Sequence, residues 1–264
     1  MQDHVIVLES CKNLRALGRD ALRGKWTEAI LATLIYCVIV EVPGILISAI
    51  FGGDSSAYLS YSTNGGVRSS GGSTIAFIYM MLINGPLTFG IVIYYIRLFR
   101  RQNCELSLVM SGFDRFGKTL ALWLYIFLFV FLWTLLFVVP GIIAAIRYSQ
   151  SFYILADNPQ MRIPDIVNES KRMMYGNKGK FFLMNLSFIG WCLLASIPAM
   201  IIGAAMAALG FESDGLAMDI AKFIGSLFEI GVMSYMFSTG VAFYDILSGR
   251  LMPQQTEIPG QRQF

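Results

Sequence analysis

Residues 119–156 read TLALWLYIFLFVFLWTLLFVVPGIIAAIRYSQSFYILA, a stretch that is apolar except for Arg147 and a few small polar groups. A helix needs about 20 apolar residues to cross the hydrocarbon core of a bilayer, which is roughly 30 Å thick. The stretch is therefore long enough for two spans joined by a very tight turn, or for one long kinked helix. The choice between these alternatives fixes the topology of the whole chain.

Four further windows are apolar and long enough to span a membrane: Trp26–Phe51, Thr74–Phe99, Lys180–Leu209 and Leu216–Leu247. Of the 264 residues, 56% are apolar and 14% are charged, whereas a soluble domain carries about 25% charged residues. This composition excludes a soluble globular protein, and 20 Phe, 12 Tyr and 4 Trp exclude a disordered chain. A net charge of +3 is too small to indicate nucleic acid as a partner.

The positions of the lysines and arginines decide how the long stretch crosses the membrane. Lysines and arginines are concentrated in segments 12–25, 97–118 and 162–180. One outer loop has a single basic residue, Arg68, and the other has none, only the acidic Glu212 and Asp214. Cytoplasmic loops carry an excess of Lys and Arg. All three basic segments are therefore predicted to be cytoplasmic, which requires two crossings within residues 119–156. The sequence thus predicts a hairpin that turns at Pro140-Gly141, six spans, and both termini in the cytoplasm.

Residues that recur at corresponding positions of the spans indicate a threefold internal repeat. Each odd-numbered span opens with Gly-Lys, at Lys25, Lys118 and Lys180, and a proline follows each lysine at a similar separation. Each even-numbered span ends with an aromatic pair, at residues 94–95, 152–153 and 243–244. We interpret these as three hairpins related by a pseudo-axis along the membrane normal. The alternative is that any chain of hairpins shows lysine inside and proline near the outer turn.

A short amphipathic stretch precedes each hairpin. In Glu9–Arg23 the apolar residues follow helical spacing and the arginines lie on another face, and residues 106–116 and 164–174 repeat this arrangement. Glycines 24, 117 and 176 suit the left-handed ends of such helices. We expect cytoplasmic interfacial helices beneath the hairpins, acting either as simple anchors or as a lipid-sensing collar.

The predicted fold is thus all-α: one polytopic membrane domain over residues 1–264, with six transmembrane helices in three pseudo-repeated hairpins, each preceded by an amphipathic helix. Repeat 1 covers about residues 10–103, repeat 2 about 104–158 and repeat 3 about 159–250, and residues 251–264 form a cytoplasmic tail.

Two long motifs point to a known family. They are LLFVVPGIIAAIRYSQSFYILADNP at residues 135–159 and ESKRMMYGNKGKFFLMNLSFIGW at residues 169–191, and Gly85-Pro86-Leu87 fits the same pattern. The chain resembles, over about residues 15–248, a bacterial family of integral membrane proteins classed as a domain of unknown function. That family is distantly similar to the membrane domain of glycerophosphodiester phosphodiesterases, but this chain has no room for their catalytic barrel. The resemblance implies six helices and a location in the cytoplasmic membrane, and supplies no substrate.

Four polar residues are predicted to share one depth in the outer half of the membrane: Glu41, Asn84, Arg147 and Glu229. An ionisable group at mid-span costs about 2.5–3.5 kcal/mol on insertion scales, so each is a functional candidate. We predict a buried cluster in which Arg147 pairs with Glu41 or Glu229. This cluster is either a satisfied structural bridge or the lining of a water-filled cavity for an ion, proton or polar head group.

Four lysines at the inner ends of the spans are predicted to face anionic lipid head groups: Lys25, Lys118, Lys178 and Lys180. No nucleophile elbow, zinc-binding motif, phosphate loop or catalytic triad is present, which argues against an enzyme. The four cysteines are widely spaced and His4 is the only histidine, so neither a metal site nor a cofactor is expected.

The functional prediction is a bacterial membrane protein that binds or transports a small molecule, ion or lipid head group through its buried polar cluster. The ligand would be a small polar or amphiphilic molecule. The alternative is a non-transporting scaffold, partner-binding subunit, or envelope-stress or immunity factor that acts through its cytoplasmic amphipathic helices. Fold alone does not choose between them.

Overall fold

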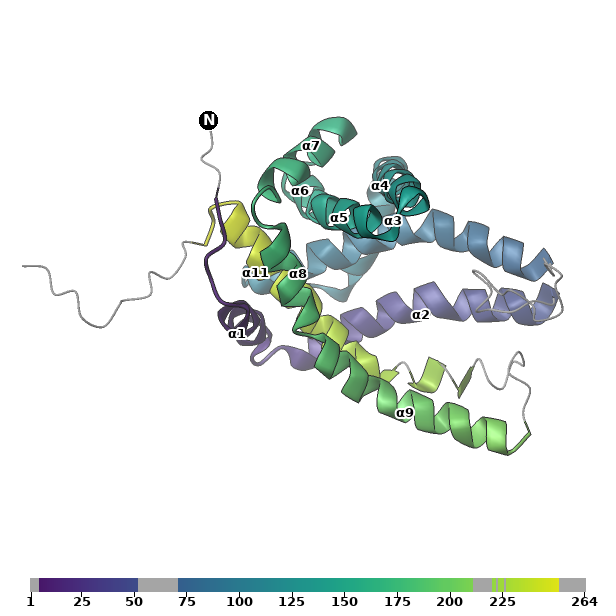
Figure 1. The fold of residues 1–264 in the computed structure, drawn as a ribbon. Coiled ribbons are helices and arrows are strands. Elements are labelled where there is room, and N and C mark those ends of the chain that lie inside the picture. Colours follow the sequence, from purple (N-terminus) through teal and green to yellow (C-terminus); the bar gives the residue numbers. More distant parts are fainter. Residues whose placement is uncertain (1–4, 52–70, 211–219, 222, 226, 252–264) are drawn as a thin grey trace, which may run out of the picture.

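The computed structural model describes residues 5–51, 71–210, 220–221, 223–225 and 227–251, and every regular element in this part of the chain is a helix (Figure 1). The loops that contain Arg68 and Glu212, and the tail 252–264, lie outside the described residues. In chain order the elements are α1 Cys11–Leu22, α2 Trp26–Phe51, α3 Gly71–Phe99, η1 Leu106–Arg115, α4 Phe116–Leu136, α5 Val138–Tyr148, α6 Ser151–Asp157, α7 Ile163–Met173, α8 Lys178–Leu186, α9 Ile189–Ala208, η2 Leu227–Glu229 and α11 Ile230–Leu247.

Six helical segments in the described chain are long and apolar enough to cross a membrane. They are Trp26–Ile47, Thr74–Phe99, Leu106–Leu136, Val138–Asp157, Lys178–Ala208 and Phe223–Leu247. The number of spans agrees with the prediction from hydropathy. These segments make the chain a multi-pass membrane protein.

The long apolar stretch folds as two helices that pack against each other, α4 and α5. The turn between them is the single residue Phe137, whose extended backbone (φ −158°, ψ 146°) separates the two helices. The predicted turn at Pro140-Gly141 is therefore misplaced. Pro140 lies in the first turn of α5, where a missing backbone N–H costs nothing. A Cβ on Gly141 would collide with Thr134 of α4, so this glycine permits the close approach of the two helices.

The span that begins with α5 is interrupted near its middle. The helix ends at Tyr148, and α6 starts at Ser151. Gln150 and Ser151 are fully buried at the interruption. The amide nitrogen of Gln150 donates to the Ser149 hydroxyl at 2.9 Å, whereas the Gln150 amide oxygen and the Ser151 hydroxyl have no hydrogen-bond partner among the described residues.

The core lies where α3, α6 and α11 come together. Tyr94, Tyr95, Phe152 and Tyr244 of the aromatic pairs noted in the sequence are buried here, and the ring of the half-buried Tyr153 stacks on that of Tyr244 with the centroids 5.3 Å apart. Tyr95 shares a fully buried hydroxyl cluster with Thr33 (2.6 Å) and, through Thr33, with Ser234 (2.9 Å).

The long helices spread away from this core (Figure 1) and expose large apolar side chains. Examples are Leu31, Leu46, Phe77, Leu128, Leu194, Ile201 and Phe228. Such a surface is expected to face lipid, because a soluble protein rarely exposes so extensive an apolar face.

Helices α1, η1 and α7 each pack against one of the core helices. A Cβ on Gly18 of α1 would meet Thr239 of α11, and the Ser238 hydroxyl donates to the Gly18 carbonyl at 2.8 Å. Close contacts also join Gly112 of η1 to Pro86 of α3. Gly24 (φ +80°) and Gly176 (φ +74°) adopt the expected left-handed conformation, whereas glycine 117 lies inside the first turn of α4. The prediction for that glycine was wrong, because η1 runs directly into α4 and leaves no helix end there to terminate.

The N-terminal segment is held by the turn between α7 and α8. The fully buried Asn177 accepts a hydrogen bond from the Val7 N–H and donates one to the Val5 carbonyl, both at 2.8 Å. Val7 is buried in a second apolar cluster with Leu14 and Phe243. The first described residues are therefore part of the folded base of the molecule.

Candidate functional site

The structure does not bring the predicted polar cluster together. Arg147 forms no ion pair with a described residue, and its backbone carbonyl accepts a hydrogen bond from Ser170 of α7 at 2.8 Å. The predicted pairing of Arg147 with Glu41 or Glu229 is wrong. The physical reason is that α5 packs against α4, α7 and α8, not against the helix that carries Glu41.

Glu41 and Glu229 nevertheless share a region. Both are half-buried, and both lie within electrostatic range of Cys37 on α2. Asn84 directs its amide nitrogen to the sulfur of Met80 in its own helix, at 4.0 Å. The four residues thus divide between the α2–η2 region, α3 and α5.

The four predicted head-group lysines have different surroundings. Lys118 donates to the Pro159 carbonyl at 2.7 Å and joins α4 to the turn before α7. Lys25 contacts the sulfur of Cys104 at 3.6 Å. Lys178 and Lys180 are half-buried in the first turn of α8. Contact of these lysines with lipid stays a prediction.

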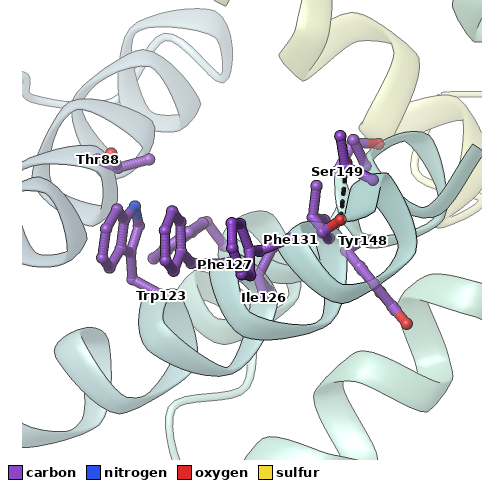
Figure 2. Close-up of a pocket in the computed structure, with 11 residues that line it drawn as sticks. Thr88, Trp123, Ile126, Phe127, Phe131, Tyr148 and Ser149 are labelled. Atoms are coloured by element: carbon purple, nitrogen blue, oxygen red, sulfur yellow. Dashed lines mark hydrogen bonds between the residues drawn. The ribbon is translucent and has the colours of Figure 1, made fainter. Parts of the chain in front are cut away.

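A pocket of about 520 Å³ lies between α3, α4 and the α5–α6 segment (Figure 2). This volume falls within the range of small-molecule sites. Most of its lining is apolar. The residues are Thr88 from α3, Trp123, Ile126, Phe127, Val130, Phe131 and Thr134 from α4, Ala145 and Tyr148 from α5, and Ser149 and Phe152 from the α5–α6 segment.

A row of aromatic rings forms one wall of the pocket. Trp123, Phe127 and Phe131 are spaced four residues apart, so they lie on one face of α4. Their rings stack in succession, with centroids 5.2 Å and 6.0 Å apart (Figure 2). The sequence contained this signal, because the spacing can be read directly from residues 119–136. The sequence did not show that α3, α4 and the α5–α6 segment leave a space beside this row, which makes the row the wall of a pocket.

Polar groups are confined to the two ends of this row. At one end, Thr88 lies beside the indole of Trp123 (Figure 2) and within interaction range of the Tyr36 hydroxyl. The indole N–H of Trp123 has no acceptor among the described residues. At the other end, the Ser149 hydroxyl already donates to the Ile146 carbonyl at 2.9 Å. None of the described lining residues is charged.

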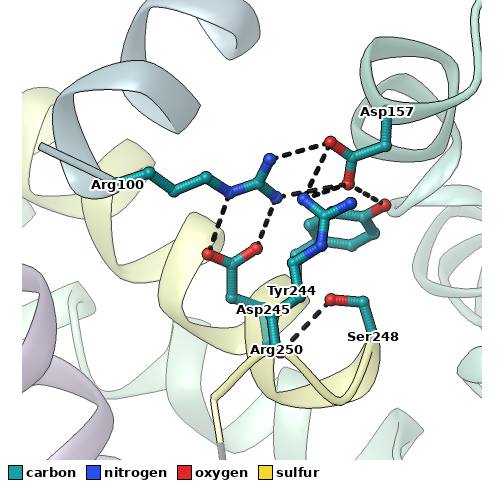
Figure 3. A network of polar contacts seen from close by, with 6 residues as sticks. All are labelled: Arg100, Asp157, Tyr244, Asp245, Ser248 and Arg250. Carbon is teal, nitrogen blue, oxygen red and sulfur yellow. Dashed lines mark hydrogen bonds and ion pairs between the residues drawn. The ribbon is translucent and has the colours of Figure 1, made fainter. Parts of the chain in front are cut away.

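A second polar feature is an ion-pair network at the base of the molecule, which we call the clasp (Figure 3). Arg100 follows α3 and binds two carboxylates, Asp157 at the end of α6 (2.8 Å) and Asp245 in α11 (2.6 Å). Asp157 also accepts hydrogen bonds from the Tyr244 hydroxyl (2.8 Å) and from Arg250 (3.0 Å). The clasp therefore joins the ends of the three core helices.

The electrostatics of the clasp favour its charged form. Burial opposes the charge on Arg100, but hydrogen bonds and attraction from Asp245 and Asp157 outweigh burial and raise the pKa of the guanidinium above its ordinary value. Two arginines balance two aspartates, and each carboxylate is hydrogen-bonded. These properties are those of a satisfied structural network rather than of a reactive site.

The fold and these sites define an all-helical, multi-pass membrane protein with an apolar pocket and a polar clasp. Comparison with family models gives two matches, over residues 8–146 and 134–250, to the family described as "Protein of unknown function (DUF975)". The chain belongs to this family. A comparison with curated proteins found no match, and a comparison with solved structures found none. The expected similarity to the membrane domain of glycerophosphodiester phosphodiesterases is therefore not shown.

Proposed function

We propose that this protein binds a small amphiphilic molecule in the membrane, in the pocket bounded by the aromatic row of α4, and captures or transports that molecule. The pocket carries this proposal: it has the volume of a ligand site, an ordered aromatic wall and polar groups only at its ends. Apolar sites with a few placed polar groups are typical of small-molecule binding. The proposed function is still the predicted binding of a ligand, but the proposed binding site is this pocket and not the cluster around Arg147.

The proposed setting is a bacterial cytoplasmic membrane with both termini inside. Three hairpins (α2–α3, α4–α5/α6 and α8/α9–α11) would cross it, and α1, η1 and α7 would lie at the inner interface. The three basic segments support this orientation, because Lys and Arg are enriched in cytoplasmic loops. Lys178 and Lys180 would then lie at the level of anionic head groups.

Partner binding through the amphipathic helices has less support. Leu14, Gly18 and Leu22 of α1 are buried, as are Val109 and Gly112 of η1. Ile166 and Val167 of α7 are also buried. Because these residues already pack within the chain, they are not free to bind another protein, although Leu106 and Met110 of η1 are exposed.

Quenching of tryptophan fluorescence would test the pocket as a binding site. Replacing Trp26, Trp133 and Trp191 by Phe leaves Trp123 as the only reporter. A brominated long-chain amphiphile added to the detergent-purified protein should quench this reporter saturably, because the indole lines the pocket. Ala145→Phe, which fills the pocket, should abolish the saturable part.

The matched control is Ala207→Phe, which adds the same ring to an exposed alanine of α9. It should leave the quenching curve unchanged. Quenching that rises without saturation, or that Ala145→Phe leaves intact, would show that Trp123 meets only bulk detergent and lipid, and would refute the proposal.

A further inference from the structure

We infer that the occupant of the pocket is an uncharged amphiphile, with its hydrogen-bonding head group at the Thr88 and Trp123 end and its apolar chain along Phe127 and Phe131. This inference rests on the proposed function and adds to it the chemical class and orientation of the ligand. The observations that carry it are the distribution of polar atoms around the pocket and the lack of charge in its described lining.

The Thr88 end offers one hydrogen-bond donor that the described residues do not use, the indole N–H of Trp123. An indole N–H is a donor only, and that of Trp123 has no acceptor among the described residues. Thr88 and Trp123 are both half-buried, and both line the pocket. The Thr88 hydroxyl interacts with the Tyr36 hydroxyl, and because a hydroxyl has one donor and two acceptor sites, it can also form a hydrogen bond with a ligand. A ligand hydroxyl or ester carbonyl placed here could accept from Trp123 and exchange a hydrogen bond with Thr88.

The opposite end of the pocket is less able to hold a head group. The Ser149 hydroxyl donates to the Ile146 carbonyl and accepts from the Gln150 amide. Thr134 donates its hydroxyl to the Val130 carbonyl of its own helix at 2.8 Å. The Ser149 and Thr134 hydroxyls are therefore already used within the chain, and the Tyr148 hydroxyl points away from the aromatic row (Figure 2), so the apolar chain of the ligand is the part that fits there.

The absence of charged side chains from the described lining disfavours the common ionic head groups. A carboxylate or ammonium group moved from water into an apolar site loses most of its hydration, and only a paired charge offsets that loss. The described lining has neither an acidic nor a basic side chain. An aromatic face does attract cations, but that attraction is small beside the loss of hydration without a carboxylate partner. An uncharged head group avoids this cost.

A series of probes with one brominated chain and three head groups tests the inference. The Trp123 reporter variant is titrated with the long-chain alcohol, the carboxylic acid at a pH where it is ionised, and the alkyltrimethylammonium. The alcohol should bind at least about tenfold more tightly than either ion, because only the ions lose charge hydration in the pocket.

Two threonine variants then locate the head group. Thr88→Val keeps the shape of the side chain and removes its hydroxyl, so the alcohol should bind about threefold to tenfold more weakly. Thr134→Val removes the other threonine hydroxyl of the lining and should not change the affinity. The midpoint of thermal unfolding of both variants is measured to show that they fold.

The outcomes separate the inference from the proposed function. Equal affinity for the three head groups, or tighter binding of an ion, would overturn the inference while the pocket remained a binding site. Equal effects of Thr88→Val and Thr134→Val would overturn the orientation. If no probe quenches saturably, the proposed function fails and the inference fails with it.

Discussion

Removal of the central cation of the clasp should destabilise the protein strongly. Arg100→Met leaves the Asp245 carboxylate, whose side chain is only 4% exposed, without its hydrogen-bond partner, because Arg100 supplies both bonds to it. Asp157 keeps Tyr244 and Arg250. Breaking a buried ion pair from one side costs about 3–5 kcal/mol. For a chain of this size that corresponds to a fall of about 6–20 °C in the midpoint of thermal unfolding.

The assay is thermal unfolding of the detergent-purified protein, followed by size-exclusion chromatography after heating. Arg162→Met is the matched control, since Arg162 pairs with Asp165 on the surface and its side chain is 84% exposed. Such exposed pairs contribute about 0–1 kcal/mol. In the double variant Arg100→Met, Asp245→Leu, stability should partly return, because an apolar pair no longer contains a lone buried charge. If Arg100→Met loses no more stability than Arg162→Met, the clasp does not hold the core helices together.

Four further substitutions test other contacts by the same unfolding assay. Gly112→Ala should destabilise, because its methyl group would collide with the backbone of Pro86, whereas Gly117→Ala, with open space around it, should be neutral or stabilise by about 0.5–1 kcal/mol. Arg147→Ala should cost less than about 1 kcal/mol, because its side chain has no ion pair with a described residue; a large loss would restore the predicted cluster. Ser151→Ala should be neutral or stabilise by about 1 kcal/mol, because it removes a buried hydroxyl that has no described partner, and a clear loss would show an unrecognised bond.

The spans could be predicted because length and apolarity along the chain are sufficient to define them. The turn of the central hairpin could not be located, because Phe137 breaks the helix by adopting an extended backbone that any residue can adopt. Pro140 gave a misleading signal, since a proline is equally acceptable in a first helical turn. The interruption after Tyr148 has neither Gly nor Pro to mark it.

The site was harder to predict, because depth within a span does not reveal which helices a residue faces. Arg147 and Glu41 were expected to meet since both were predicted at one depth in the outer half of the membrane, yet their helices do not pack together. The clasp was missed for a related reason. Arg100 and Asp245 lie 145 residues apart in the sequence, and each lies at the end of a span. A single charge costs little at that position, so neither residue was predicted to be functional.

The packing of α1 against α11 can form only late in the synthesis of the protein. The carbonyl of Arg15 accepts its hydrogen bond from Tyr235, which follows it by 220 residues. At about 5–20 residues per second, ribosomes need about 10–45 s to make that interval. During this time the earlier spans enter the membrane while the face of α1 that packs against α11 has no partner. Helix α1 thus completes its native contacts only after Tyr235 has been made, and a nascent chain truncated before residue 235 should leave α1 more accessible to protease.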